Sequence, residues 1–348
     1  MDEAIKVLRI KGHEITDEEA NGALACILLH DVGHGPFSHA LEHTLTNGIH
    51  HEDFSLALMN YLNKELKGEL STCISIFKNE YPKKFLHQLV SGQLDVDRLD
   101  YLRRDSFFTG VTEGNIGSAR IIKMLDLKND KLVVEAKGIY SIENFLTSRR
   151  LMYWQVYLHK TAVAAEKMLI KVLIRAKELT NNGVNLFASP ALQYFLQKNI
   201  DKAYFEKKMD EVLLHFVKLD DNDIWSALKV WADHEDVVLS KLSDCLVNRK
   251  LFKIEITNEE LPASYIQKYI ERYMSEFNIT ENEASYFCSS DVIYTNMYNE
   301  VDDSIDILYN DGTIKDISEA SDMLNIQLLS KKVEKHYFSY LKILPTNN

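Results

Sequence analysis

The chain has 348 residues and carries 40 lysines and arginines against 52 aspartates and glutamates, a formal net charge of −12. This acidic balance argues against a nucleic-acid-binding surface as the main function, because such surfaces need an excess of positive charge. No apolar run approaches the roughly 18 residues that a membrane-spanning helix needs, and no signal peptide precedes the first expected helix. The four cysteines are scattered without CxxC spacing, which indicates neither a zinc knuckle nor a disulfide framework and favours a reduced, cytoplasmic setting.

The segment from Thr16 to Glu19 has the pattern of a capping box, so we predict a helix that begins near Asp17. In this motif the threonine hydroxyl accepts the amide of Glu19, and the glutamate carboxylate accepts the amide of Thr16. Apolar residues then recur at the i, i+3, i+4, i+7 and i+8 positions, which predicts one buried stripe. The stripe consists of Ala20, Ala23, Leu24, Ile27 and Leu28.

The end of this helix runs into residues 28–39, which read Leu-Leu-His-Asp-Val-Gly-His-Gly-Pro-Phe-Ser-His. His30 and Asp31 emerge where the helix ends, and there adjacent side chains can converge on one ion although helical neighbours point about 100° apart. An imidazole nitrogen beside a carboxylate oxygen suits iron, manganese, zinc, nickel or magnesium. A solvated pair is the alternative for His-Asp alone. The further histidines at 34 and 39, around a glycine- and proline-rich turn, favour the metal.

Residues 28–39 resemble the signature of the HD-domain metal-dependent phosphohydrolases. The stretch 33–39 resembles the branch that contains the deoxynucleoside triphosphate triphosphohydrolases. The resemblance implies a mainly α fold with a helical HD core, a divalent metal ion (Mn, Mg, Fe, Zn or Ni) and a nucleotide substrate. It also implies a homo-oligomer and a possible regulatory nucleotide.

A second segment, residues 94–105, resembles the family segment that supplies the last metal carboxylate, and this carboxylate corresponds to Asp97. As a helix, the segment places Asp97, Tyr101 and Asp105 at i, i+4 and i+8 on one face. Alone, such a face could equally be exposed to solvent and carry Asp-Arg ion pairs. Its position after the first motif, in the family's order, favours the site.

Two further segments are similar to those of the family. His51 opens a predicted helix and matches a residue near the phosphates, although a polar helix start can also serve only as a cap. In residues 148–160, Arg149 matches an arginine that holds the triphosphate, and Tyr157 matches a tyrosine beside the deoxyribose. Leu158 stands where relatives usually have glutamine. The aromatic residues of this segment could equally belong to the core.

The reaction that the resemblance implies is hydrolysis at the α-phosphorus of a deoxynucleoside triphosphate, which releases deoxynucleoside and inorganic triphosphate. The alternatives are another HD phosphohydrolase, either a monophosphatase or a phosphodiesterase, and a non-catalytic nucleotide-binding module. The residues implied are the metal ligands His30, Asp31 and Asp97, the catalytic residues His34, His39, Glu42 and His51, and the substrate-binding residues Arg98, Tyr101, Asp105, Arg149 and Tyr157.

Relatives take one more metal ligand from a histidine in an Arg-Phe-x-His-like segment upstream of the His-Asp pair, and the chain begins after it. His13 lies in an expected loop and is a weak substitute. The amphipathic run Ala4, Ile5 and Leu8 resembles the middle of a helix, so we expect a chain that starts late relative to its natural gene. A weakened or inactive relative is the alternative.

Helical periodicity continues to about residue 248, with a strand expected at residues 131–137 and a long helix over 142–179. The Asn-Asn-Gly segment that ends at Gly183 marks the edge of the helical core. Beyond residue 248 alternating patterns predict strands at 251–256, 305–309 and 336–341, with a hairpin turn at 310–313. The expected domains are an HD core at 1–183, a helical extension at 184–248 and a smaller α+β unit at 249–348.

Overall fold

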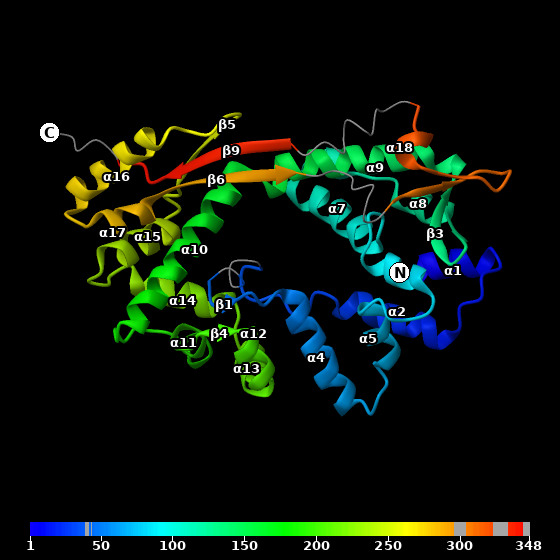
Figure 1. The fold of residues 1–348 in the computed structure, drawn as a ribbon, viewed down its shortest axis with the longest axis horizontal. Helices are drawn as coiled ribbons and strands as arrows, with labels where there is room; N and C mark the ends of the chain where they lie inside the picture. The colour runs from blue at the N-terminus through cyan, green and yellow to red at the C-terminus, as the bar shows by residue number, and fades with distance from the viewer. Residues whose placement is uncertain (39–41, 43, 296–303, 323–332, 344–348) are drawn as a thin grey trace. The chain divides into compact units, whose positions relative to one another are not determined.

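The structure, a computed structural model, describes residues 1–38, 42, 44–295, 304–322 and 333–343 (Figure 1). The chain forms two compact units, each assembled from three separate stretches. Unit 1 comprises Met1–Val32, Ser55–Leu158 and Thr295–Val333, and unit 2 comprises Gly33–Phe54, His159–Tyr294 and Glu334–Asn348. The expected domain boundaries at residues 183 and 248 stay a prediction.

Helices dominate both units, which confirms a mainly α chain with a smaller α+β part. Within the described residues, no helix is long and apolar enough to cross a membrane. The helices of unit 1 are α1 (Asp2–Ile10), α2 (Asp17–Leu29), α4 (His51–Glu65, which begins in unit 2), α5 (Ser71–Phe77), α6 (Lys84–Val90), α7 (Val96–Thr109), α8 (Ser118–Met124), α9 (Ile139–Met152) and α18 (Ile317–Ala320).

Unit 1 also holds a four-stranded sheet in the order β2-β3-β7-β8. Strands β2 (Leu125–Lys128) and β3 (Lys131–Glu135) are antiparallel, and so are β7 (Asp306–Leu308) and β8 (Ile314–Asp316). Both local predictions, the strand after residue 130 and the hairpin around residue 310, are therefore confirmed. The parallel pairing of β3 with β7 joins segments that lie far apart in the sequence.

Helix α2 begins as expected. The hydroxyl of Thr16 accepts the amide of Glu19 at 3.2 Å, and the Glu19 carboxylate accepts the amide of Thr16 at 2.8 Å. The predicted burial of Leu28 is wrong, because its side chain is 79% exposed. The face that packs on α5 includes Gly22 and Cys26, and Leu28 lies two residues, about 200°, around the helix from Cys26.

The long helix expected over residues 142–179 is interrupted. Helix α9 ends at Met152, and a π-helical turn (Tyr153–Tyr157) follows it. Helix α10 (Lys160–Asn181) then starts anew, with His159 as its N-cap. Single π-helical turns are frequent at functional sites, so this interruption bears on the residues around it.

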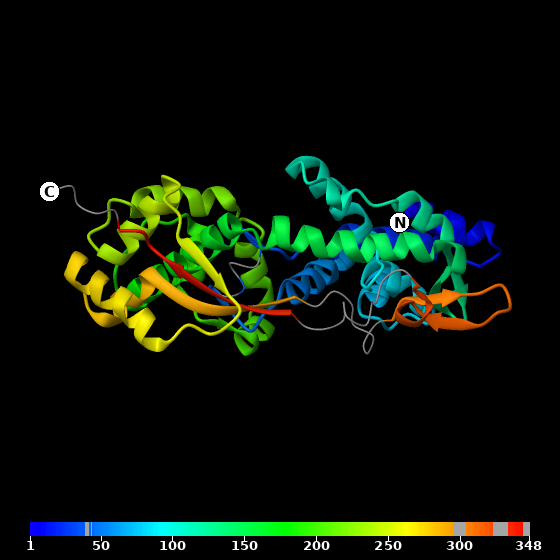
Figure 2. The same ribbon diagram turned by 90° about the horizontal axis from the view of Figure 1, so that it is seen from above.

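Unit 2 combines helices with a three-stranded sheet. Its strand β9 (Val333–Tyr340) lies between β5 (Lys253–Thr257) and β6 (Cys288–Thr295), as Figure 2 shows. Strand β1 (Thr46–Asn47) pairs with β4 (Ile200–Asp201) elsewhere in the unit. The helices that follow α10 are α11 (Pro190–Gln197), α12 (Lys202–Lys207), α13 (Met209–Phe216), α14 (Asp221–Trp231), α15 (Val237–Val247), α16 (Ala263–Phe277) and α17 (Glu281–Ala284).

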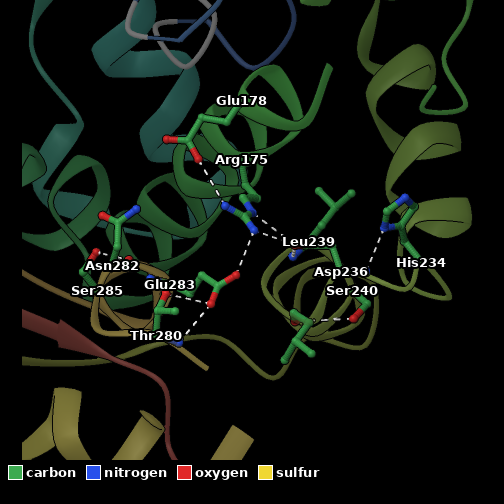
Figure 3. Close-up of polar contacts among 11 residues, drawn as sticks. Arg175, Glu178, His234, Asp236, Leu239, Ser240, Thr280, Asn282, Glu283 and Ser285 are labelled. Carbon is green, nitrogen blue, oxygen red and sulfur yellow. Dashed lines mark hydrogen bonds and ion pairs between the residues drawn. The ribbon is translucent and has the colours of Figure 1, made fainter. Parts of the chain in front are cut away.

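One arginine links three helices of unit 2. Arg175 of α10 donates to both carboxylate oxygens of Asp236, the N-cap of α15, at 2.6 and 3.2 Å. It also donates to Glu178 at 3.3 Å and to Glu283 of α17 at 3.2 Å (Figure 3). Glu283 belongs to the capping box of α17, so the guanidinium connects the ends of two short helices to the long one.

A neighbouring lysine supplies a test of this packing. The ammonium of Lys171 donates to the backbone carbonyl of Ser285 at 2.9 Å and lies 5.7 Å from the ring centroid of Tyr286. Burial lowers the pKa of Lys171 to about 8, with Lys167 acting in the same direction and Cys288 opposing it. Because the unfolded chain binds this proton more tightly, the native state gains stability as pH rises from about 8 to about 10.

We therefore predict that the unfolding free energy of the wild type, relative to Lys171→Met, rises by roughly 1–2 kcal/mol between about pH 7.5 and pH 9.5. Urea denaturation of both proteins at the two pH values measures this difference. A gap that stays constant or moves in the opposite direction contradicts a buried, destabilising charge at Lys171.

Candidate functional site

The ends of two helices in unit 1 bring three predicted ligands together. His30 is the C-cap of α2, Asp31 follows it, and Asp97 lies in the first turn of α7. The Nε2 atom of His30 lies 3.4 Å from Oδ2 of Asp31 and 3.8 Å from Oδ2 of Asp97. One ligand atom from each residue lies within 4.8 Å of the others, so the three donors can face one ion.

The other ring nitrogen of His30 sets which atom is available to a metal. Its Nδ1 lies 2.8 Å from the backbone carbonyl of Ile27, to which it donates, so the neutral ring presents the lone pair of Nε2. Burial lowers the pKa of His30, but the hydrogen bond to Asp97 and the charge of Asp31 outweigh it and raise the pKa to about 9. The environment therefore favours a positive charge at this point, which fits a divalent cation that displaces the proton.

Asp95 anchors the helix that carries Asp97. Its side chain is buried and accepts the backbone amides of Arg98 at 2.7 Å and of Gly92 at 3.1 Å. It also forms an ion pair with the guanidinium of Arg98. The start of α7 is thereby fixed, and the predicted substrate residue Arg98 is held by its neighbour one turn away. Sequence reasoning missed this role, although an aspartate three residues before Arg98 is a recognisable N-cap pattern.

The predicted sugar-facing residues also lie together. The phenol of Tyr157 donates to a carboxylate oxygen of Asp105 at 2.6 Å, and the rings of Tyr101 and Tyr157 meet edge to face with centroids 6.0 Å apart. Burial, aided by the charge of the neighbouring Tyr153, raises the pKa of Tyr101 to about 12. Both phenols therefore remain neutral hydrogen-bond donors at physiological pH. The π-helical turn carries Tyr157 to this position.

Arg149 is a buried cation that can donate further hydrogen bonds. It is 9% exposed, and its Nη1 donates to Oε1 of Gln93 at 3.0 Å. Its guanidinium carbon lies 6.0 Å from the ring centroid of Tyr153, and its Nε has no hydrogen-bond partner among the described residues. An unsatisfied buried donor on a charged group is costly, so an anion that accepts from it would be strongly favoured. No pattern in the sequence pointed to Gln93.

A histidine cluster lies in the first stretch of unit 2. The rings of His34 and His51 stack with centroids 4.0 Å apart. The carboxylate of Glu42, whose side chain is 9% exposed, lies 2.9 Å from Nδ1 of His51, 4.0 Å from Nδ1 of His34 and 3.5 Å from Nδ1 of His50. Sequence reasoning did not single out His50, whose only signal is its place beside His51. The predicted catalytic residue His39 lies outside the described residues.

His13, the weak substitute for the upstream ligand, lies elsewhere. Its Nε2 is 2.5 Å from Oδ1 of Asp126 in β2. The structure therefore brings together, in unit 1, the three residues that the two motifs predict as ligands, and His13 contacts Asp126 instead.

Comparisons with known proteins extend these observations. The HD associated region family model matches residues 116–203. The uncharacterized protein YwfO of Bacillus subtilis is 33% identical over 347 residues, 95% of this chain and 76% of YwfO. The deoxynucleoside triphosphate triphosphohydrolase SAMHD1 homolog of Dictyostelium discoideum is 28% identical over 182 residues, 47% of this chain and 35% of that protein. A crystal structure of a phosphohydrolase from Bacteroides thetaiotaomicron matches at 62% identity with a TM-score of 0.93, covering 98% of this chain and 84% of that chain.

The geometry of the three ligands leads to a prediction about metal affinity. Asp97→Ala removes one of three protein donors and leaves His30 and Asp31, so the affinity for Mn²⁺ falls by at least about tenfold. Equilibrium dialysis followed by metal analysis measures this loss. His13→Ala, which disrupts a histidine–aspartate contact outside the ligand set, is the control and keeps wild-type affinity. If Asp97→Ala binds Mn²⁺ as the wild type does, the assignment of Asp97 as a ligand is wrong.

Proposed function

Since the chain belongs to the family of HD-domain phosphohydrolases, we propose that it hydrolyses deoxynucleoside triphosphates to deoxynucleoside and inorganic triphosphate. The observation that carries this proposal is the presence, within unit 1, of both the three-ligand set and the buried Arg149 with an unused Nε donor. A triphosphate carries its negative charge over three groups, so it needs cationic partners both at the reacting phosphorus and beyond it.

HD-domain phosphohydrolases are generally dependent on divalent metal ions, and His30, Asp31 and Asp97 would hold the ion in this chain. When bound, a divalent ion supplies a Lewis acid that polarises the phosphoryl oxygen and acidifies water. The hydrogen bond from Nδ1 of His30 to the carbonyl of Ile27 keeps Nε2 directed to that role. Asp95 holds the first turn of α7 in place, so Asp97 needs little reorganisation.

In this proposal the histidine cluster binds the phosphate, and His39 transfers a proton or orients the water. His34 and His51 would steady the phosphate at the reacting phosphorus, and Glu42 would orient His51 through the contact with its Nδ1. His39, supported by Glu42, would protonate the leaving 5′-oxygen or orient the attacking water, which imidazole can do near neutral pH. The described contacts of Glu42 support its role as a positioning residue.

The remaining residues would bind the rest of the substrate. Arg149 would pair with the outer phosphates, and Arg98 would add positive charge near them. Tyr101 would pack against the sugar. Asp105, which accepts a hydrogen bond from Tyr157, would also accept one from the 3′-hydroxyl of the sugar. The homo-oligomer, the regulatory nucleotide and the cytoplasmic location stay predictions.

Product analysis tests the reaction directly. The protein, incubated with each deoxynucleoside triphosphate and Mn²⁺ or Mg²⁺, is expected to yield deoxynucleoside and inorganic triphosphate in equal amounts, which chromatography separates. Orthophosphate or pyrophosphate as the first product would instead support another HD phosphohydrolase. Absence of turnover in a metal-loaded protein would support a non-catalytic nucleotide-binding module.

The assignment of Arg149 predicts a selective loss. Arg149→Ala removes a charge-assisted contact to the outer phosphates, so kcat/KM for deoxynucleoside triphosphates falls by roughly 10- to 100-fold. Arg149→Lys restores little, because an ammonium cannot replace the planar fork of the guanidinium.

Two controls separate this loss from misfolding. Arg120→Ala removes an exposed arginine of α8 in the same unit and is expected to leave kcat/KM unchanged. Turnover of bis(p-nitrophenyl) phosphate, which has no outer phosphates, should be the same in Arg149→Ala and the wild type. An equal loss on both substrates would contradict a role for Arg149 in binding the outer phosphates.

A further inference from the structure

The turn that follows His34 has an unfavourable backbone conformation. The amide of Ser38 donates to the carbonyl of Gly35 at 3.0 Å, which closes a four-residue turn with Pro36 and Phe37 at its centre. The φ angles of Phe37 and Ser38 are both 54°, in the left-handed region. Turns with a positive φ at the third position favour glycine or asparagine there, because a larger side chain crowds the backbone. Other contacts must therefore stabilise Phe37 in this conformation.

The first such contact comes from helix α14, far along the chain in the same unit. One carboxylate oxygen of Asp221 accepts the backbone amide of Phe37 at 3.0 Å, and among the described residues this is the one hydrogen bond of that carboxylate. The first turn of α14 does not need the Asp221 side chain, because Asp220 is the N-cap and forms a capping box with Asp223. The carboxylate of Asp221 is thus available to bind the turn.

The second contact is aromatic. Trp225 lies one helical turn after Asp221, and its ring meets the ring of Phe37 edge to face with centroids 5.9 Å apart. Phe37 and Ser38 also line an apolar cavity of about 390 Å³, together with Leu169 of α10. A cavity offers few packing contacts to the side chains that line it, so the turn depends on its contacts with α14.

The position of the turn matters for the histidine cluster. His34 directly precedes Gly35, the first residue of the turn, and its ring stacks on that of His51 with centroids 4.0 Å apart. A displacement of the turn would therefore move His34 relative to His51. Displacement of a catalytic group by about 1 Å can greatly reduce the rate of a reaction even when the substrate still binds.

We propose that Asp221 and Trp225 are positioning residues, which fix the turn at Phe37 and so keep His34 stacked on His51. The effect on turnover rests on the proposed function, whereas the contact with the turn does not depend on any reaction. Asp221 acts in this proposal as a hydrogen-bond acceptor. An acidic residue in the first turn of a helix can instead act only through its charge, by interacting with the helix dipole. Asparagine distinguishes the two roles, because it keeps the side-chain oxygen and loses the charge.

Amide hydrogen exchange of the fragment that contains residues 35–38, read by mass spectrometry, tests the contact without turnover. In Asp221→Ala this fragment is expected to exchange at least about fivefold faster than in the wild type, because the turn opens more often. Trp225→Ala is expected to have the same effect. Asp221→Asn and Trp225→Phe, which keep the acceptor and the ring pair, are expected to exchange as the wild type does. The control Asp210→Ala, which removes an acidic residue from the first turn of α13, leaves the exchange unchanged.

Steady-state kinetics with a deoxynucleoside triphosphate test the positioning role. In Asp221→Ala we expect kcat to fall roughly 10- to 100-fold. KM should stay within about twofold of the wild-type value, because the residues proposed to bind the outer phosphates and the sugar belong to unit 1. Asp221→Asn restores most of kcat, and Asp210→Ala keeps the wild-type value.

The outcomes separate this proposal from the proposed function. Wild-type kcat in Asp221→Ala contradicts the positioning role, whatever the exchange shows. An equal loss in Asp221→Asn or in Asp210→Ala also contradicts it, because charge at a helix start would then be the cause. If Asp221→Ala does not fold, Trp225→Ala and Trp225→Phe decide by the same two measurements. If the exchange changes as expected but the wild type hydrolyses no nucleotide, the contact with the turn is confirmed and the proposed function fails.

Discussion

The chemistry assigned to this chain depends on the convergence of two helix ends, at His30 and at Asp97. Adjacent residues within a helix point in different directions, so His30 and Asp31 can share an ion only because α2 ends there. Asp97 can join them because Asp95 caps α7 and fixes its first turn. The backbone carbonyl of Ile27 completes the arrangement by directing Nε2 of His30 toward the carboxylates.

Elsewhere in unit 1, a break in a helix also positions side chains, and one buried donor has no partner among the described residues. The π-helical turn after α9 carries Tyr157 to Asp105, and Arg149 of α9 is buried with its Nε unsatisfied. A buried guanidinium in this state costs stability, and functional sites commonly retain such costs because a ligand offsets them.

Local patterns in the sequence predicted those features that depend on neighbouring residues. The capping box at Thr16, the shared face of Asp97, Tyr101 and Asp105, and the hairpin near residue 310 all follow from spacing alone. Tertiary packing decided the rest. The exposure of Leu28 depends on which face of α2 meets α5, and the pairing of β3 with β7 joins strands far apart in the chain. The contact between Gln93 and Arg149 has no local signal.

The most direct test of this account is to locate the ion itself. Crystals of the protein grown with Mn²⁺ should give an anomalous difference peak among Nε2 of His30 and the carboxylates of Asp31 and Asp97, at distances of about 2.0–2.3 Å from each ligand atom. The absence of a peak there from a crystal that contains Mn²⁺, or a peak ligated by other residues, would contradict the claim that these two helix ends form the metal centre.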